Sequence, residues 1–132
     1  MNISEISSDS MAKLASIVTD EVSIYYITNS TQLGAILANV QSRNLNLYYM
    51  SLSEENTKAL VTAMSRVPAV VLGVVTLDPE LLSAYDGQGS CNLLAVGGYM
   101  RGKYGARLKK WAGDIGWTVT QDSDEFLRIE RT

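Results

Sequence analysis

Residues 69–77 read AVVLGVVTL, an apolar run without a single charged side chain. β-Branched residues dominate it, and these residues favour strands. A run that is apolar throughout predicts a central strand covered on both faces, because a strand with one face in water alternates apolar and polar residues. The segments on either side are therefore expected to supply the covering helices.

Similar strand-like runs precede and follow this segment at residues 22–27 (VSIYYI), 45–50 (LNLYYM) and 93–96 (LLAV). Between them, apolar residues recur at helical spacing behind capping residues, which predicts helices near residues 11–18, 33–40, 60–67 and 80–85. One of these caps is a predicted capping box formed by Ser51 and Glu54.

This alternation of helices and strands predicts the fold class. We expect a single α/β domain over residues 1–132, built as a layered sandwich. Its central sheet is predicted to be mostly parallel or mixed, with about five to six strands and helices on both faces. Residues 117–121 and 126–129 are predicted to end the domain as a hairpin.

Two of the units resemble each other at an offset of 23 residues, which aligns residues 24–27 with residues 47–50. Because two copies do not make a solenoid, we interpret them as strand–helix units that follow the same local rules. Their four tyrosines either pack within the sheet or form a partly exposed aromatic surface on it.

The composition removes several kinds of chemistry. The sequence has no histidine, which excludes Ser-His-Asp and Cys-His nucleophiles and histidine-containing metal sites. Cys91 is the only cysteine, which excludes an intrachain disulfide and a multi-cysteine zinc site. We expect no bound metal, and we interpret Cys91 as an ordinary small apolar residue.

The charge distribution argues against two classes of partner. The net charge is −3 and the pI is about 4.8, so binding to nucleic acid or to an anionic membrane is not expected. No apolar run approaches the roughly 20 residues of a membrane span, and the N-terminus lacks a signal-peptide pattern. We therefore expect a cytoplasmic protein. Its one basic patch lies between Arg101 and Lys110.

That patch begins within residues 93–108, LLAVGGYMRGKYGARL, which read as a strand, a glycine-containing turn and a helix. Such a turn directs free backbone N–H groups and the positive end of the helix at one point, where phosphate or pyrophosphate can bind. Arg101 and Lys103 are candidates to supply positive charge. The spacing matches neither a nucleotide P-loop nor the GxGxxG of a dinucleotide fold.

Residues 94–96 (LAV), followed after four residues by RGKYGARL at 101–108, resemble the acyl-CoA loop of the GNAT acyltransferase superfamily. The resemblance implies acetyl-CoA as cofactor, transfer of an acetyl group to an amine, and a cofactor site formed by Val96, Arg101, Gly102, Lys103 and Gly105. In that family the opening residues, 3–18, would be the first strand and helix. A second alignment instead places residues 104–117 and 126–129 at the family's last helix and closing strands.

The catalytic residues of such a site remain open. Without histidine, an acyl transfer would draw its acid or base from Glu, Asp or Tyr. Tyr99 and Tyr104 flank the turn and are the candidates for a general acid, although tyrosines in such positions more often pack.

Two alternative interpretations require no cofactor site. The basic residues after the turn also suit the solvated flank of a helix whose apolar stripe is Tyr104, Leu108, Trp111 and Ile115.

Small size, acidity and the lack of a recognisable catalytic group equally favour a non-enzymatic protein-binding module, such as an inhibitor, an immunity protein or a virion or assembly component. That module would use an acidic or tyrosine-rich surface against a protein partner.

Overall fold

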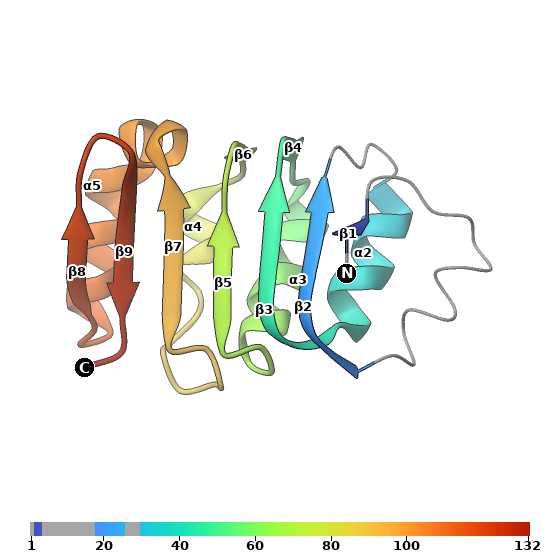
Figure 1. Ribbon diagram of the computed structural model, residues 1–132. Coiled ribbons are helices and arrows are strands. Elements are labelled where there is room, and N and C mark those ends of the chain that lie inside the picture. The colour runs from blue at the N-terminus through green and yellow to red at the C-terminus, as the bar shows by residue number, and fades with distance from the viewer. Residues whose placement is uncertain (1, 4–17, 26–29) are drawn as a thin grey trace.

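The computed structural model describes residues 2–3, 18–25 and 30–132 (Figure 1). Its main sheet has the strand order β1-β2-β3-β5-β7-β9-β8. The strands are β1 (Asn2–Ile3), β2 (Val18–Tyr25), β3 (Gln41–Tyr48), β5 (Ala69–Leu72), β7 (Leu93–Gly97), β9 (Phe126–Glu130) and β8 (Thr118–Asp122). The short strands β4 (Met50–Ser51) and β6 (Val75–Thr76) pair beyond the ends of β3 and β5.

The sheet is mixed. The strands from β1 to β7 are parallel, whereas β9 runs antiparallel to both β7 and β8. An α/β fold with a mixed sheet and a C-terminal hairpin is therefore confirmed. The predicted strand at residues 69–77 is interrupted at Gly73, so that it supplies β5 to the main sheet and β6 to the small one.

The described helices are α2 (Ser30–Asn39), α3 (Glu54–Met64), α4 (Pro79–Leu82) and α5 (Gly98–Asp114). All four lie behind the sheet in Figure 1, so the described helices cover one face of it, where the sequence predicted helices on both, and each contacts the next. Right-handed connections between strands that follow one another in the same direction place every helix on the same face, which explains this layer. The helix predicted near residues 11–18 falls mostly on residues 4–17, outside the described residues, and Val18 begins β2.

The 23-residue offset seen in the sequence continues along the sheet. Hydrogen-bonded register aligns Val22, Leu45, Val70 and Leu94, which are separated by 23, 25 and 24 residues. Each of these buried residues lies in the strand of a unit that consists of one strand and the helix after it. The parallel strands therefore follow one another at a nearly uniform spacing along the chain, as units that obey the same local rules.

The core lies between the sheet and the helices. The strands contribute alternate residues, among them Ile24, Leu47, Leu72 and Val96, and the helices contribute Leu60, Met64, Leu82, Met100 and Leu108. The N-cap of α3 is Ser53, whose hydroxyl accepts a hydrogen bond from the backbone N–H of Asn56 at 3.1 Å. The capping box predicted at Ser51 is wrong, because Ser51 is still part of β4.

Candidate functional site

The predicted acyl-CoA segment is a strand that runs directly into a helix. β7 ends at Gly97 and α5 begins at Gly98, so Arg101, Gly102, Lys103 and Gly105 all lie within the helix. Only the first backbone N–H groups of a helix lack a carbonyl partner in the helix itself. The free amides at this helix end are therefore those of residues 98–100, ahead of the predicted cofactor residues.

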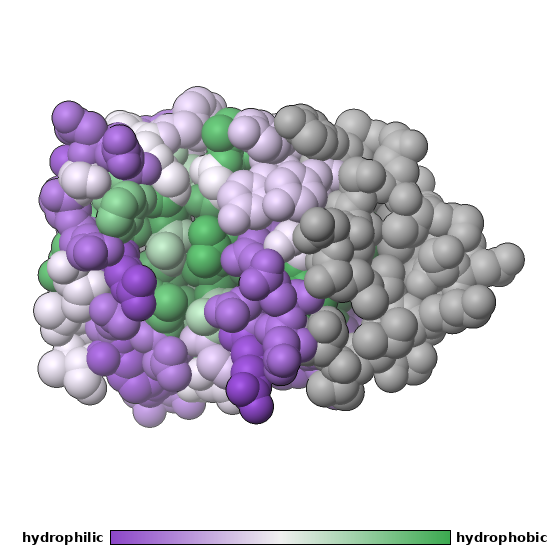
Figure 2. All heavy atoms as spheres, in the orientation of Figure 1, coloured by the Kyte–Doolittle hydropathy of each residue, from purple (hydrophilic) through white to green (hydrophobic). Residues whose placement is uncertain are grey.

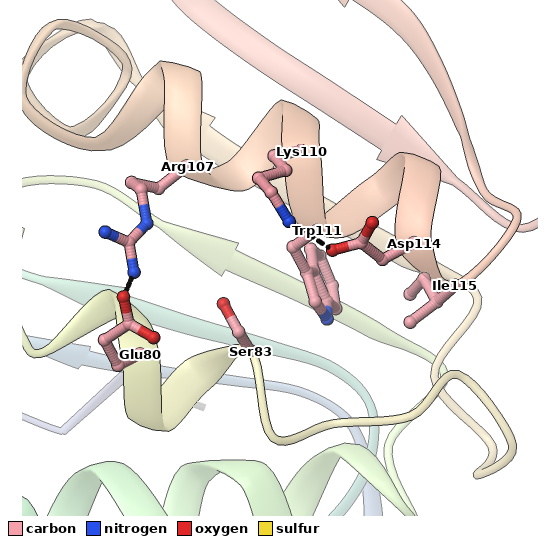
Figure 3. Close-up of a pocket in the computed structure, with 7 residues that line it drawn as sticks. All are labelled: Glu80, Ser83, Arg107, Lys110, Trp111, Asp114 and Ile115. Atoms are coloured by element: carbon pink, nitrogen blue, oxygen red, sulfur yellow. Dashed lines mark hydrogen bonds and ion pairs between the residues drawn. The ribbon is translucent and has the colours of Figure 1, made fainter.

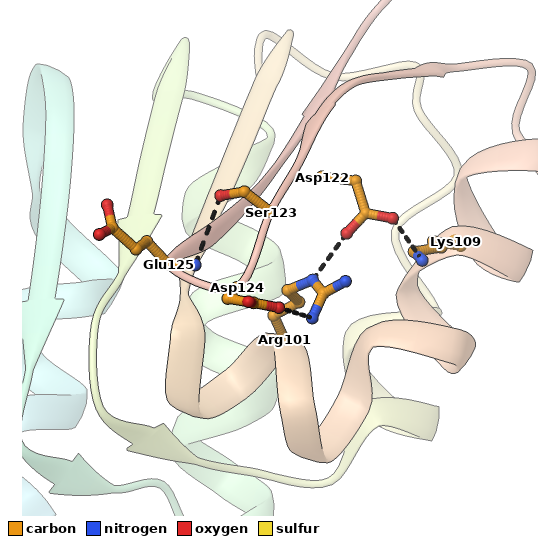
Figure 4. A network of polar contacts seen from close by, with 6 residues as sticks. All are labelled: Arg101, Lys109, Asp122, Ser123, Asp124 and Glu125. Carbon is orange, nitrogen blue, oxygen red and sulfur yellow. Dashed lines mark hydrogen bonds and ion pairs between the residues drawn. The ribbon is translucent and has the colours of Figure 1, made fainter.

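Arg101 is held by acidic residues of the hairpin turn (Figure 4). Its Nε lies 2.6 Å from Asp122 Oδ1, and its Nη1 lies 3.6 Å from Asp124 Oδ1. Lys109 Nζ contacts the other oxygen of Asp122 at 2.6 Å. The hydrogen bonds from Lys109 and Arg101 lower the pKa of Asp122. The contacts join α5 to the end of β8, so this part of the basic patch is neutralised within the chain.

The remaining predicted residues do not converge on one point. The side chain of Val96 is buried on the helix side of the sheet, Gly105 is buried within α5, and Gly102 is exposed. Lys103 Nζ lies 5.7 Å from the centre of the Tyr99 ring and 5.6 Å from that of Tyr104.

Of the two tyrosines proposed as general acids, one has a clear packing role. The hydroxyl of Tyr104 accepts a hydrogen bond from the backbone N–H of Leu77 at 3.2 Å, in a buried position. Tyr99 is exposed at the start of α5. A hydrogen bond to Tyr99, followed by the charge interaction with Tyr104, raises the pKa of Lys103.

A hollow of about 420 Å³ lies between α4 and α5 (Figure 3), and its lining residues are Glu80, Ser83, Arg107, Lys110, Trp111, Asp114 and Ile115. Its charged groups already pair with each other: Arg107 contacts Glu80, and Lys110 Nζ lies 3.0 Å from Asp114 Oδ2. The pairing of Lys110 with Asp114 is the solvated-flank arrangement expected from the sequence. A ligand here would have to break existing ion pairs.

The sheet face turned toward the viewer in Figure 1 carries a different kind of surface, which we call the open face. Side chains alternate along a strand, so residues next to the core positions point to this face. Four of them form an apolar band, with half-buried side chains from β5, β7 and β9: Val71, Leu93, Ala95 and Phe126. Figure 2 shows this apolar surface between two polar zones.

Two of the repeated tyrosines lie on the open face beside this band. Tyr25 and Tyr48 are register partners in β2 and β3, and their rings stack with centres 4.9 Å apart and planes 16° apart. The Tyr48 ring covers Gly73, where an added Cβ would collide with it. Burial and the neighbouring Tyr25 raise the pKa of Tyr48. The aromatic surface is thus one of the two outcomes that the sequence left open for these tyrosines.

Paired polar groups border the open face on both sides. On β9, Arg128 Nη2 lies 3.3 Å from Glu130 Oε1. On the other side, Asn46 donates a hydrogen bond to Ser23 Oγ at 3.0 Å, and Ser23 donates to Glu21 at 3.3 Å. The Arg128–Glu130 pair cancels charge on the β9 side, whereas on the β2 side the Glu21 carboxylate keeps its charge and accepts the hydrogen bond of Ser23.

Sequence reasoning missed Val71, Ala95 and Phe126 as surface residues. The apolar character of residues 69–77 and 93–96 was the only signal, and it reads the same for a strand buried on both faces. Only the side on which the helices lie separates the two cases. The alignment of the tyrosine pairs at the 23-residue offset was the one signal that pointed toward this face.

The described residues contain no group of three or more carboxylate or thiol side chains placed to hold a metal ion. In the same part of the chain, no helix combines the length and apolar character needed to cross a membrane. Comparisons of the chain with protein-family models, with curated proteins and with solved structures found no match.

Proposed function

We propose that this chain is a protein-binding module that recognises its partner through the open face of the sheet. The observation that carries the proposal is the apolar band of Val71, Leu93, Ala95 and Phe126 beside the stacked tyrosines, on the side away from all described helices.

Physical arguments support this choice over a small-molecule site. Parallel sheets are ordinarily covered on both faces, and here the described helices lie on one. The band is half-buried, but its four apolar side chains are contiguous on a face that no described helix covers, and tyrosine, which lies beside it, is enriched in interfaces. The charged hollow between α4 and α5 lacks this character, because its charges are internally paired.

Site-directed photo-crosslinking in cells that naturally make the protein tests the proposal. A photoreactive amino acid at Val71 should capture one partner in near-stoichiometric yield. The matched control carries the same group at Ala106, an exposed residue of α5 on the helix side. Equal capture from both positions, or capture from Ala106 alone, would contradict the proposal.

The variant Val71→Asp should then weaken binding of the captured partner by at least about tenfold, because a charge would be buried in the interface without a counter-ion. Arg107→Gln on the helix side should leave the affinity within about twofold. Isothermal titration with the purified partner measures both. A Val71→Asp protein that keeps its circular dichroism spectrum and its full affinity would exclude the open face.

The acyl-CoA function implied by the GNAT resemblance stays a prediction, and calorimetry with acetyl-CoA separates it from the open-face proposal. If it holds, acetyl-CoA binds, and binding weakens with added salt and in the double variant Arg101→Ala, Lys103→Ala. Lys110→Ala is the control, because that lysine pairs with Asp114 outside the predicted site. Our proposal expects no heat of binding at millimolar acetyl-CoA.

A further inference from the structure

Among the described residues, three large apolar side chains are exposed, and all three follow parallel strands. Tyr49 comes directly after β3 and is 50% exposed, Val74 follows β5 at 39%, and Tyr99 follows β7 at 45%. Because β3, β5 and β7 are adjacent and parallel, these residues lie in a row beyond the carboxyl ends of the three strands, at the top of Figure 1. We call this row the upper rim.

The repeat sets the spacing of the row. Adjacent strands lie about 4.8 Å apart, and an α-helix advances about 5.4 Å per turn. The backbone N–H of Met50 donates to Val74 O at 3.1 Å, which fixes the chain after β3 against the chain after β5. A helix laid across the strand ends can therefore offer one side chain per turn to each unit of the repeat.

Backbone strain accompanies this exposure at one position. Tyr49 has φ of 59°, and it is the one described residue other than glycine with positive φ. Such a conformation is strained for a residue with a Cβ. It lets Tyr48 stay on the open face and Met50 return to the core while Tyr49 lies between them, exposed.

The surroundings of the upper rim are acidic. Helices α3 and α4 start at this end of the strands, with Glu55 in the first turn of α3 and Asp78 as the N-cap of α4, and the β8–β9 turn brings Glu125 beside Gly98. These three exposed carboxylates form no ion pair within the described part of the chain. Lys103 is a basic residue beside the row, with Nζ 5.7 Å from the centre of the Tyr99 ring and 5.6 Å from that of Tyr104.

From this spacing and charge, we infer that the upper rim docks an amphipathic α-helix with a basic polar side, which lies across the strand ends with its apolar residues on Tyr49, Val74 and Tyr99. The helix belongs to a protein partner. The inference goes beyond the proposed function, because the rim residues are distinct from the apolar band and are tested separately.

Amide chemical-shift mapping of the isotope-labelled full chain tests the inference. The probe is a synthetic 15-residue peptide of leucine and lysine with leucine at helical spacing of three and four. When the peptide is added, we expect the amide shift changes to be concentrated at residues 49–55, 73–80, 97–103 and 123–125. The same peptide with glutamate in place of lysine should bind at least threefold more weakly.

The triple variant Tyr49→Asn, Val74→Ser, Tyr99→Ser should weaken peptide binding at least tenfold, and asparagine is chosen because it tolerates positive φ. If that variant does not fold, Val74→Ser and Tyr99→Ser are measured singly, each with an expected loss of at least twofold. The open-face variant Val71→Asp is the control and should bind the peptide within twofold of the original.

Unchanged affinity in the rim variants, shifts centred on Val71 and Ala95, or no shift at millimolar peptide would each overturn the inference. None of these outcomes alters the photo-crosslinking result expected at Val71. Failure of the upper rim and failure of the open face are therefore distinguishable.

Discussion

At Gly73 the open face has no room for a side chain, because the ring of Tyr48 occupies the position of a Cβ. We expect Gly73→Ala to lower the free energy of unfolding by about 1–3 kcal/mol, as overpacking typically does. Gly113→Ala is the matched control, since Gly113 lies in α5 with nothing within 4 Å of an added Cβ. It should instead stabilise by about 0.5–1 kcal/mol. Urea unfolding followed by circular dichroism measures both, and equal effects would contradict the close packing of Tyr48.

Cys91, the only cysteine in the sequence, provides a second test of the packing. Cys91 is buried and donates to Leu93 O at 3.3 Å, and burial raises its pKa to about 11. Since the thiolate is the reactive form, a disulfide reagent at pH 8 should modify the native protein at least about a hundredfold more slowly than the urea-unfolded chain. Absorbance of the released thiol follows both reactions. Comparable rates in the two states would mean that Cys91 is accessible.

Between elements, the contact of α5 with the β8–β9 hairpin predicts a pH dependence. The pKa of Asp122 is lowered in the folded protein by hydrogen bonds from Lys109 and Arg101. Its contribution to stability is therefore fully present above the ordinary aspartate value of 3.8 and is lost as the pH falls through the lower folded pKa.

Asp122→Asn should accordingly lower Tm at pH 7, and the difference from the original protein should shrink as the pH falls below the ordinary aspartate value of 3.8. Thermal unfolding between pH 7 and pH 2.5 measures this difference. Glu55→Gln is the control, because it removes an exposed carboxylate without an ion pair in the described residues. A Tm difference for Asp122→Asn that stays constant with pH would argue against the bridge to α5.

The position at which α5 begins could not be predicted from the sequence. The sequence predicted a turn after residue 96 because its glycines permit positive φ and close approach of the backbone to a ligand. The structure instead begins the helix at Gly98, where an added Cβ would lie 2.6 Å from Asp124 O in the hairpin turn. The close approach of the hairpin turn requires glycine at residue 98. Helix propensity depends only on residues close in sequence, so it cannot predict that approach.

In the whole molecule, strand position in the sheet predicts local stability. β5 lies between β3 and β7, whereas β8 is the outer strand beyond β9. We expect the amides of Val70 and Leu72 to exchange with deuterium at least about a hundredfold more slowly than those of Val119 and Gln121, because opening at a sheet edge needs less of the structure to unfold. Hydrogen-exchange mass spectrometry or NMR measures the rates, and equal protection in β5 and β8 would contradict this order.

The fold class, most elements and the hairpin were predictable because hydrophobic periodicity and caps are local properties. The pairing of the strands was not. The apolar run at residues 69–77 gave no sign that the described helices would share one side, since that depends on strand order and the handedness of the connections. The candidate surface was missed for the same reason, because Val71 and Ala95 look like core residues until the helix layer is placed.

The uniform step between strand–helix units has a consequence for how this protein can change. The units that contain β3, β5 and β7 each contribute residues to both the open face and the upper rim. Duplicating one unit would widen both surfaces by about 4.8 Å without redesigning the residues already present. Recognition built this way is adjustable in length, and a designer could tune affinity or partner size by counting units instead of rebuilding a single site.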